Sequence, residues 1–498
     1  MKLLFLIFSV FIGTSPYFNF DNSLSGNDFP DTTGVFRISK DDLMKTDTYL
    51  ASREIGGRMG GSEGFYKAAD HMAGEFKKLN LKPLGDNGYF QNLTVEYNEI
   101  LPPCKFNLIN PDGSQKIYSL GKDFVCRGFT GSGKFTADVV FCGYGFSEPA
   151  YDDYNNIDVK GKIVMIFKQN PAWKLDDKDW SPSLRNKEKI ASDRGALAII
   201  FVSKPNDQNP QKPIGSVLDG EGTQNENFPM IHADIPVANE ILENSGNKIT
   251  DLQTIIDSLK QPHSFDLQKS VLLEVNAKYE KDRKTMNVVG MLEGSDEKLK
   301  NEYLILGAHL DHVGTQANEI YFPGANDNGS GSSAVLEMAR AFANCSERPK
   351  RSIVFVLFSN EESGMHGSGY FAGHPPVPIE KTVAMFNLDC IASGDSIHLG
   401  NGKSAPELWN LAKNIDKVFT KSSIENTWNG GGADATPFHQ KGIPCLYFVS
   451  FYSYTHLHLI TDTPETLNPS LFEKITKLCY VTAREVADGN YKRETVVN

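Results

Sequence analysis

The stretch YLILGAHLDHVG at residues 303–314, with GANDNGSG at 324–331 after it, decides the predicted fold. Its first four residues form a short apolar run that is typical of a fully buried strand. The glycine-rich turn leads into SSAVLEMARAFA at 332–343, where apolar residues recur at helical spacing. Strand, loop and helix in this order are the repeating unit of an α/β protein.

Polar side chains of the kind that bind metal ions lie in this stretch. His309 and Asp311 come where the predicted strand ends, and Asp327 lies in the turn. Ligands in open α/β sheets gather at the carboxyl ends of the strands. Each residue alone has an ordinary explanation, because a lone aspartate before a helix is usually a cap. Only similar residues at neighbouring strand ends would indicate a site.

Apolar runs alternate with helical patterns over much of the chain. Strands are predicted at 89–97, 271–280, 285–294, 352–362, 383–391 and 442–450, and amphipathic helices at 40–50 and 64–81. This alternation predicts an α/β fold with a mostly parallel mixed sheet and helices on both faces.

Between the predicted strands at 89–97 and 271–280, the sequence changes to short apolar runs separated by Gly, Pro and Asp. Strands are predicted at 137–145, 160–167 and 196–203, and the proline-rich and glycine-rich segment 206–216 excludes a regular element. None of these strands ends in a cluster of metal-type residues. We therefore expect a smaller β-rich inserted domain without a catalytic role.

Length and charge limit the classes of function. A chain of 498 residues exceeds one ordinary hydrophobic core, so at least two domains are expected. The formal net charge of -12 argues against nucleic acid as a partner, because phosphate binding needs a basic surface. The seven cysteines include no CxxC pair, which argues against a thiolate zinc site and leaves any disulfide pairing open.

The first residues have the pattern of a secretory signal. A lysine at position 2 precedes the apolar stretch 3–13, and small residues at 13–15 suit cleavage. The apolar stretch is too short to span a bilayer comfortably. We expect an exported protein, periplasmic or secreted, with no stable membrane association.

Carboxylates and histidines also follow the later predicted strands. Glu361 and Glu362 end one strand, Asp389 ends the next, and His456 and His458 come late in the chain. Adjacent carboxylates repel each other unless a cation lies between them. His309, Asp327, Glu362, Asp389 and one late histidine form a donor set that suits two zinc ions sharing Asp327. Two metal ions at such a site activate water for hydrolysis.

These motifs resemble an exported di-zinc aminopeptidase family that includes bacterial leucyl aminopeptidases and relatives of glutamate carboxypeptidase. The matching motifs, in order, are GGR, GAHLDH, GANDNGSG, NEESG with HGS after it, FNLD and HxxxDT. The resemblance covers residues 40–125 and 270–488. The segment between them resembles a protease-associated domain through GYG at 143–145, VKGKIVMI at 159–166 and KIASDRGALAIIF at 189–201.

The resemblance implies a division of the chain. It consists of a signal peptide at 1–16, an N-terminal part of the peptidase domain at 17–125, a protease-associated insert at 126–270 and the catalytic di-zinc domain at 271–498. The usual role of such an insert is that of a lid or substrate-access module, and a plain structural insert is the alternative.

The resemblance also implies a role for each site residue. His309 and Asp389 would hold one zinc ion, Glu362 and His458 the other, and Asp327 would bridge both. Asp311 would orient the ring of His309. Glu361 would be the general base, taking a proton from the bridging water and passing it to the leaving amine. Asp434 resembles an outer position that supports the ligands.

Two positions depart from the family pattern. Many relatives have a tyrosine that holds the substrate carbonyl where this chain has Leu457, and a histidine where it has Ala435. Tyr452, Tyr454 and His456 are the candidates to replace the tyrosine.

The expected function is removal of N-terminal residues from peptide substrates. A carboxypeptidase of the same fold acting on acidic C-terminal residues is one alternative, and it would need cationic side chains such as Arg340, Arg348 or Arg351 in the pocket. A glutaminyl cyclase, associated with a single zinc ion, is another, and a binding protein without metals is a third. Residue preference and oligomeric state are left open.

Overall fold

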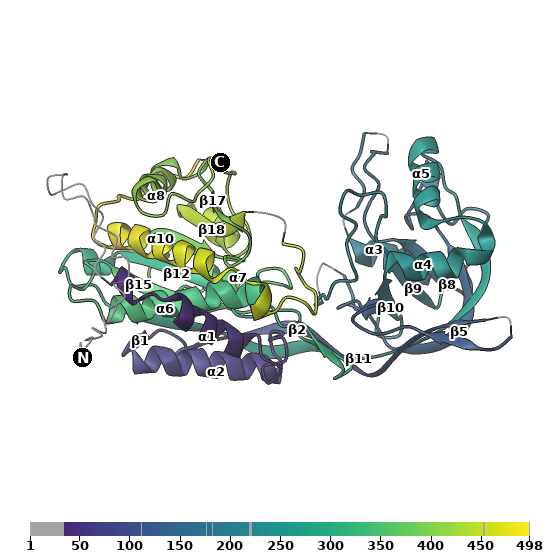
Figure 1. Cartoon of the computed structure of the whole chain (residues 1–498), viewed down its shortest axis with the longest axis horizontal. Helices are drawn as coiled ribbons and strands as arrows, with labels where there is room; N and C mark the ends of the chain where they lie inside the picture. The colour runs from purple at the N-terminus through teal and green to yellow at the C-terminus, as the bar shows by residue number, and fades with distance from the viewer. Residues whose placement is uncertain are drawn as a thin grey trace, which may run out of the picture.

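The computed structural model describes residues 34–497 apart from 111, 176, 182, 219–221 and 452–453. The predicted signal peptide lies outside the described residues. The chain forms two lobes that are joined along one side by the long strands β2 (Phe90–Ile109) and β11 (Phe265–Leu292) (Figure 1). Among the described residues, no helix combines the length and the apolar composition needed to cross a bilayer.

The larger lobe is built on a mixed sheet, as predicted. β12 (Tyr303–His309) lies between β15 (Ser352–Phe358) and β16 (Thr382–Leu388), parallel to both. β18 (Cys445–Phe451) continues the sheet in parallel beyond β16, and β17 (Ser396–Gly400) closes the edge antiparallel to it. The carboxyl ends of four parallel strands therefore meet at one edge of the sheet.

Helices cover both faces of this sheet because successive residues of each buried strand point to opposite sides. Leu304 and Leu306 of β12 belong to one apolar cluster, and Ile305 belongs to another. The first cluster is closed by α1 (Lys40–Leu50), α2 (Glu63–Lys78), α6 (Gly331–Ala343), α8 (Pro406–Val418) and α10 (Pro469–Ala487), and the second by α7 (His366–Gly373) and α9 (Ala435–Gln440).

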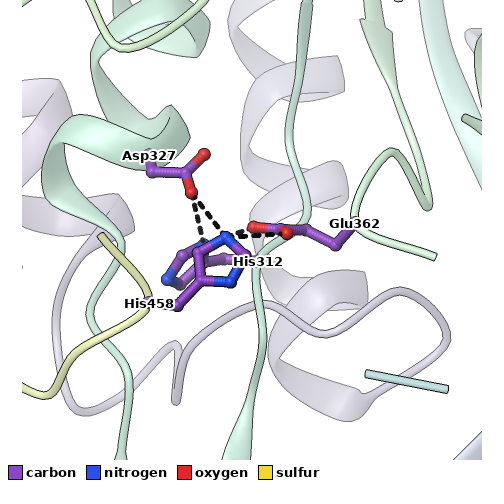
Figure 2. Close-up of side chains that lie close together, drawn as sticks. All are labelled: His312, Asp327, Glu362 and His458. Atoms are coloured by element: carbon purple, nitrogen blue, oxygen red, sulfur yellow. Dashed lines mark hydrogen bonds and ion pairs between the residues drawn. The ribbon is translucent and has the colours of Figure 1, made fainter. Parts of the chain in front are cut away.

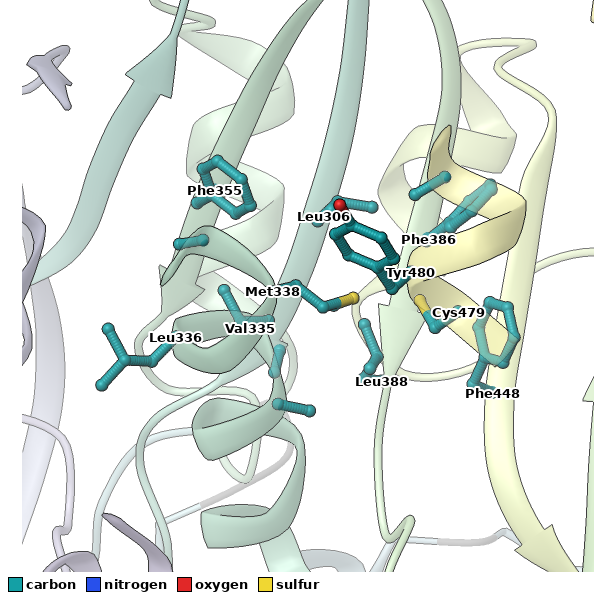
Figure 3. Packing of buried hydrophobic residues seen from close by; sticks show 14 of the residues in the cluster. Leu306, Val335, Leu336, Met338, Phe355, Phe386, Leu388, Phe448, Cys479 and Tyr480 are labelled. Carbon is teal, nitrogen blue, oxygen red and sulfur yellow. The ribbon is translucent and has the colours of Figure 1, made fainter. Parts of the chain in front are cut away.

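Figure 3 shows the first cluster, where Met338 of α6 and Tyr480 of α10 pack over Leu306 and Phe386. These side chains are fully buried. Burying a large apolar side chain contributes about 1.5–3 kcal/mol, so this interface is a main source of the lobe's stability.

The two N-terminal helices start where the sequence places hydroxyl caps. Ser39 accepts a hydrogen bond from the N–H of Asp42, and Ser62 accepts one from the N–H of Phe65. Such caps satisfy amide groups that the first helical turn leaves without partners. The observed α1 has the predicted bounds, and α2 lies within about three residues of its predicted ends.

The smaller lobe contains a second parallel array. β5 (Gly133–Phe141), β8 (Ile163–Phe167), β9 (Ala198–Val202) and β10 (Met230–Ala233) run parallel, and β4 (Phe124–Cys126) pairs antiparallel with β10. The helices of this lobe are α3 (Leu184–Asp193), α4 (Ile235–Leu242) and α5 (Ile249–Leu259). The segment 206–216 contains no helix or strand, as predicted.

The lobes share their two longest strands. β2 (Phe90–Ile109) pairs antiparallel with β11 (Phe265–Leu292), and β11 also pairs with β5 in one lobe and β15 in the other. The prediction of separate strands at 271–280 and 285–294 was therefore wrong. Polar residues interrupt the apolar pattern between them, but the ladder to β2 continues there through a bulge. The domain boundaries at 126 and 270 stay predictions.

Short strands complete the sheets and the site loop: β1 (Lys82–Pro83), β3 (Gln115–Ile117), β6 (Ser147–Glu148), β7 (Tyr151–Asp152), β13 (Thr315–Gln316) and β14 (Ile320–Tyr321). β13 pairs with both β14 and β2, so the loop after β12 is attached to the strands that connect the lobes.

Candidate metal centre

The strand ends of the larger lobe bring the predicted site residues together. His309 is the last residue of β12, Glu361 and Glu362 follow β15, and Asp389 follows β16. The register aligns His309 with Phe358, so these loops start at the same level of the sheet. Asp327 enters from the turn before α6, and His458 comes from the loop after β18.

One group of donors consists of His309, Asp327 and Asp389. Nε2 of His309 lies 3.4 Å from Oδ1 of Asp327 and 3.4 Å from Oδ1 of Asp389. All three residues are buried. Tyr447 donates a hydrogen bond of 2.7 Å to Oδ2 of Asp389, whereas Oδ1 is buried without a hydrogen-bond partner.

A second group shares Asp327 with the first (Figure 2). Nε2 of His458 lies 3.0 Å from Oδ2 of Asp327 and 3.0 Å from Oε2 of Glu362. The five residues predicted to bind metal are thus all in place, divided between two groups as predicted, with Asp327 in both. Their role as ligands stays a prediction.

His312, for which the sequence motifs predicted no role, also lies in the second group. Its Nδ1 is 2.8 Å from Oε1 of Glu362 and 3.6 Å from Oδ2 of Asp327, and the residue is fully buried. The signal was present in the sequence. His312 follows His309 by three residues at the same strand end, which is where metal-type residues are expected.

Asp311 fixes the neighbouring loop. Its carboxylate accepts hydrogen bonds from the N–H groups of Glu361 at 3.1 Å and Glu362 at 3.3 Å. Nδ1 of His309 lies 3.2 Å from the backbone oxygen of Asp311 and 3.7 Å from its carboxylate Oδ1. Asp311 therefore holds the loop that carries both glutamates, in addition to its predicted action on the His309 ring.

Glu361 is outside both donor groups. Burial raises the pKa of its carboxyl group well above the usual value, and the nearby carboxylates of Asp434 and Glu362 raise it further. Asp434 is fully buried, and burial raises its pKa to about 7. A carboxylate free of ligand contacts and favouring its protonated form is suited to proton transfer.

Asp462, the aspartate of the HxxxDT motif, shapes the turn that presents Asp327. Its carboxylate accepts hydrogen bonds from the N–H groups of Asn326 at 2.8 Å and Asp327 at 3.1 Å, and Tyr454 donates to it as well. Tyr454 is therefore engaged by Asp462. His456 lies near the hydroxyl of Thr461, and Tyr452 lies outside the described residues.

Arg58 of the GGR motif is fully buried and binds the backbone of two loops at the site. It donates hydrogen bonds of 2.8 Å to the backbone oxygens of Leu50, Leu310, Pro323 and Gly324. Leu310 lies next to His309, and Gly324 starts the turn that carries Asp327. One side chain thereby connects α1 with the loop after β12 and with the turn that carries Asp327.

The donor set fits divalent cations. Several carboxylates, among them Asp311, Glu361 and Asp434, share this buried region, and burying ionised carboxylates is costly unless they are paired or bind a metal. Burial alone would lower the pKa of His309, but Asp389 and Asp327 outweigh it and raise the pKa. Imidazole and carboxylate donors suit zinc, and Oδ1 of Asp389, which accepts no hydrogen bond, is available to a metal ion.

Replacing Tyr447 by phenylalanine should weaken metal binding at the first group. The change removes the hydroxyl that holds Oδ2 of Asp389, and losing such an outer partner lowers metal affinity about 10- to 100-fold. Competition with a chromogenic chelator measures this affinity. Tyr89→Phe is the matched control, because it removes a hydroxyl that donates to the oxygen of Leu81. Equal affinities in both variants would contradict the expectation.

Comparisons with known proteins agree with this geometry. The profile of peptidase family M28 matches residues 287–483. Aminopeptidase YwaD of Bacillus subtilis (strain 168) is 25% identical over 411 residues, which are 80% of this chain and 73% of that protein. A glutamate carboxypeptidase 2 homolog of Caenorhabditis briggsae is 23% identical over 438 residues, with 72% of this chain covered but only 54% of that protein.

Solved structures share the fold over nearly the whole chain. An aminopeptidase from Aneurinibacillus sp. strain AM-1 superimposes with a TM-score of 0.63 at 19% identity, covering 93% of this chain and 96% of that one. A peptidase M28 precursor from Shewanella amazonensis SB2B gives 0.65 at 19% identity, covering 92% and 100%. These likenesses confirm the predicted α/β class.

The fold and its clustered donors define a hydrolase of the metallopeptidase class. The match to the profile of peptidase family M28 spans residues 287–483, which contain all the donors described above. The predicted enzyme class, a peptidase, is therefore confirmed. The identity of the smaller lobe as a protease-associated domain stays a prediction.

Proposed function

We propose that this chain is an exported zinc aminopeptidase that holds two zinc ions and uses Glu361 as general base. The relationship to aminopeptidases over most of the chain supports the reaction, and a related Bacillus subtilis structure is titled a zinc aminopeptidase. Export rests on the sequence of residues 1–16 alone. Peptides are the substrates that membership of a peptidase family implies.

The observation that carries the proposal is the sharing of Asp327 by two donor groups beside a separate carboxylate. His309 and Asp389 would hold one ion, Glu362 and His458 the other, and Asp327 both. Zinc bound there would supply a Lewis acid for the substrate carbonyl.

Glu361 then acts on protons. Its carboxylate is held next to the ligands because Asp311 fixes the N–H of Glu361 and of Glu362. It accepts a proton from the attacking water and transfers it to the nitrogen of the departing amine. Its raised pKa makes the protonated form available for that second transfer.

Metal removal tests the proposal. The purified chain should hydrolyse one or more aminoacyl-p-nitroanilides, lose this activity after dialysis against a chelator, and regain it with zinc. Elemental analysis of the active form should give two zinc ions per chain. N-blocked dipeptides with a C-terminal glutamate serve as the opposing substrates. Turnover of only the blocked dipeptides would refute the aminopeptidase assignment.

The carboxypeptidase alternative has named relatives in its favour. It needs a cation for the substrate carboxylate, and two of the arginines considered for this are engaged elsewhere. Arg340 pairs with Glu75 and Glu337. Arg351 pairs with Glu302, and it directly precedes β15, at the opposite end of that strand from the site. Their positions favour the aminopeptidase.

A glutaminyl cyclase with a single zinc ion is less consistent with the donors. Two groups are present, and both are complete in histidine and carboxylate. Elemental analysis giving one zinc ion per chain, with release of cyclised product from glutaminyl peptides, would favour the cyclase.

A further inference from the structure

Glu362 is held from two sides, one through each carboxylate oxygen. Oε2 lies 3.0 Å from Nε2 of His458, which also approaches Asp327, whereas Oε1 lies 2.8 Å from Nδ1 of His312 (Figure 2). Nε2 of His458 therefore lies 3.0 Å from both Oδ2 of Asp327 and Oε2 of Glu362, and these three donor atoms form a compact set. Oε1 lies on the His312 side of this set.

The ring of His312 has little freedom to turn. A Cβ atom added to Gly324 would lie 2.5 Å from its Cδ2 and 2.6 Å from its Cγ, so the ring packs directly against that glycine. The backbone N–H of His312 also donates to the oxygen of Arg58 at 3.2 Å. The fixed ring therefore presents Nδ1 to Glu362 in one orientation.

The tautomer follows from the other ring nitrogen. Nε2 of His312 is buried and has no hydrogen-bond partner. Ligating histidines nearly always donate their second N–H to a carboxylate, carbonyl or water, and a buried N–H without an acceptor is costly. The proton is better placed on Nδ1, where it can be donated to Oε1 of Glu362. Nδ1 is then a donor and has no lone pair for a metal ion.

We propose that His312 is a positioning residue for the second metal ion: its Nδ1–H fixes Glu362 so that Oε2 faces the ion. The inference rests on the proposed metallopeptidase function. It leaves three protein donors at the second group, His458, Asp327 and Glu362. Catalytic zinc sites have three protein ligands and an open position, whereas four protein ligands are typical of closed structural sites.

Two substitutions of nearly equal shape separate donation from ligation. In His312→Asn the side-chain amide can donate from nearly the position of Nδ1, and in His312→Leu it cannot. We expect Asn to keep zinc affinity close to that of the parent protein and Leu to lower it about 10- to 100-fold at one of the two ions. Chelator competition measures both affinities. Binding at the His309 and Asp389 group reports whether each variant is folded.

X-ray absorption of the zinc-loaded parent supplies a readout independent of activity. The proposal expects two imidazoles shared by two zinc ions. Three imidazoles, with Asn and Leu equally weakened, would show that His312 is a ligand and overturn it. Unchanged affinity in both variants would overturn it too. A folded parent protein that binds no zinc would instead refute the proposed function.

A second inference concerns two cysteines at the junction of the lobes. Cys104 of β2 and Cys126 at the end of β4 are both buried, and their sulfur atoms lie 3.7 Å apart. The backbone of Cys126 is bound on both sides by the Gln316 side chain, through hydrogen bonds of 2.9 Å and 2.8 Å. Gln316 belongs to the loop that follows the metal-binding stretch.

We infer that Cys104 and Cys126 form a disulfide under oxidising conditions. Each thiol would lose its hydrogen as the sulfur–sulfur bond forms, and the two electrons would reduce a low-molecular-weight disulfide such as oxidised glutathione to two thiols. The small gap between the sulfurs needs only a local side-chain adjustment. The bond would connect β2 to β4 beside the Gln316 contact.

Peptide mapping tests this pairing. The full chain is incubated with oxidised glutathione, denatured, alkylated without reduction and digested. The expected result is one linked peptide pair containing Cys104 and Cys126, which is absent from Cys104→Ser, and unfolding at a higher urea concentration than the reduced chain. Alkylation of both cysteines in the oxidised parent protein, or their linkage to other cysteines, would overturn the inference.

Discussion

Glu361→Gln should lower kcat by about 10²–10⁴-fold while zinc content stays at the parent value. Glutamine keeps the size of the side chain but cannot accept the proton from water at neutral pH. The residue is outside both donor groups, so metal binding does not depend on it. The fixed loop geometry also survives, because Asp311 holds position 361 through its backbone N–H.

Turnover of an aminoacyl-p-nitroanilide and elemental analysis of the same sample measure the two effects separately. Glu319→Gln is the matched control, since this exposed carboxylate lies on the loop after β12 and should leave kcat unchanged. Near-parent turnover by Glu361→Gln would refute the assigned base. Loss of zinc together with turnover would mean that Glu361 supports the metal ions directly.

Arg58→Ala should lower the free energy of unfolding by about 3–5 kcal/mol, as expected when one partner is removed from a buried charged contact. The guanidinium group is fully buried and donates to four backbone oxygens. Asp47 is also fully buried, and Arg58 opposes the rise in its pKa that burial causes. Alanine removes the guanidinium donors from these oxygens and leaves Asp47 without its nearby cation.

Urea unfolding of the zinc-free chain measures the loss without a contribution from metal binding. Arg53→Ala is the control on the same segment, because Arg53 is exposed and its guanidinium lies 5.7 Å from the ring of Tyr321. We expect it to cost less than about 1 kcal/mol. Arg58→Lys should recover only part of the loss, because one ammonium group cannot reach the oxygens that the planar guanidinium serves. A loss below that of Arg53→Ala would contradict the role of Arg58.

The site could be predicted from the sequence where the same local pattern recurs, namely an apolar run followed by a histidine or a carboxylate. Apolar runs that stop at His309, Glu361 and Asp389 predict strand ends, and parallel pairing then brings these ends to one edge of the sheet. Asp327 could be placed because the glycine-rich turn precedes a helical pattern. The five predicted ligands lie together for this reason.

Other features depend on contacts that no local pattern contains. Tyr447 lies inside a strand, and only the fold brings its hydroxyl to Asp389. The position of His312 at a marked strand end was visible in the sequence, but its contact with Glu362, 50 residues away, is seen only in the fold. The two strands predicted in place of β11 were separated by polar residues, but backbone pairing with β2 does not require apolar side chains there.

In the part of the chain that the structure describes, the smaller lobe contacts the loop that carries His458. The N–H of Gly215 donates a hydrogen bond of 2.7 Å to the backbone oxygen of His458, and Val217 packs with Val313 and Phe322 of the larger lobe. A shortened enzyme made by removing residues 126–270 would therefore lose a hydrogen bond to the loop of His458, one of the predicted ligands. A shortened chain would need another hydrogen-bond donor to the backbone oxygen of His458, even if the smaller lobe makes no contact with the substrate.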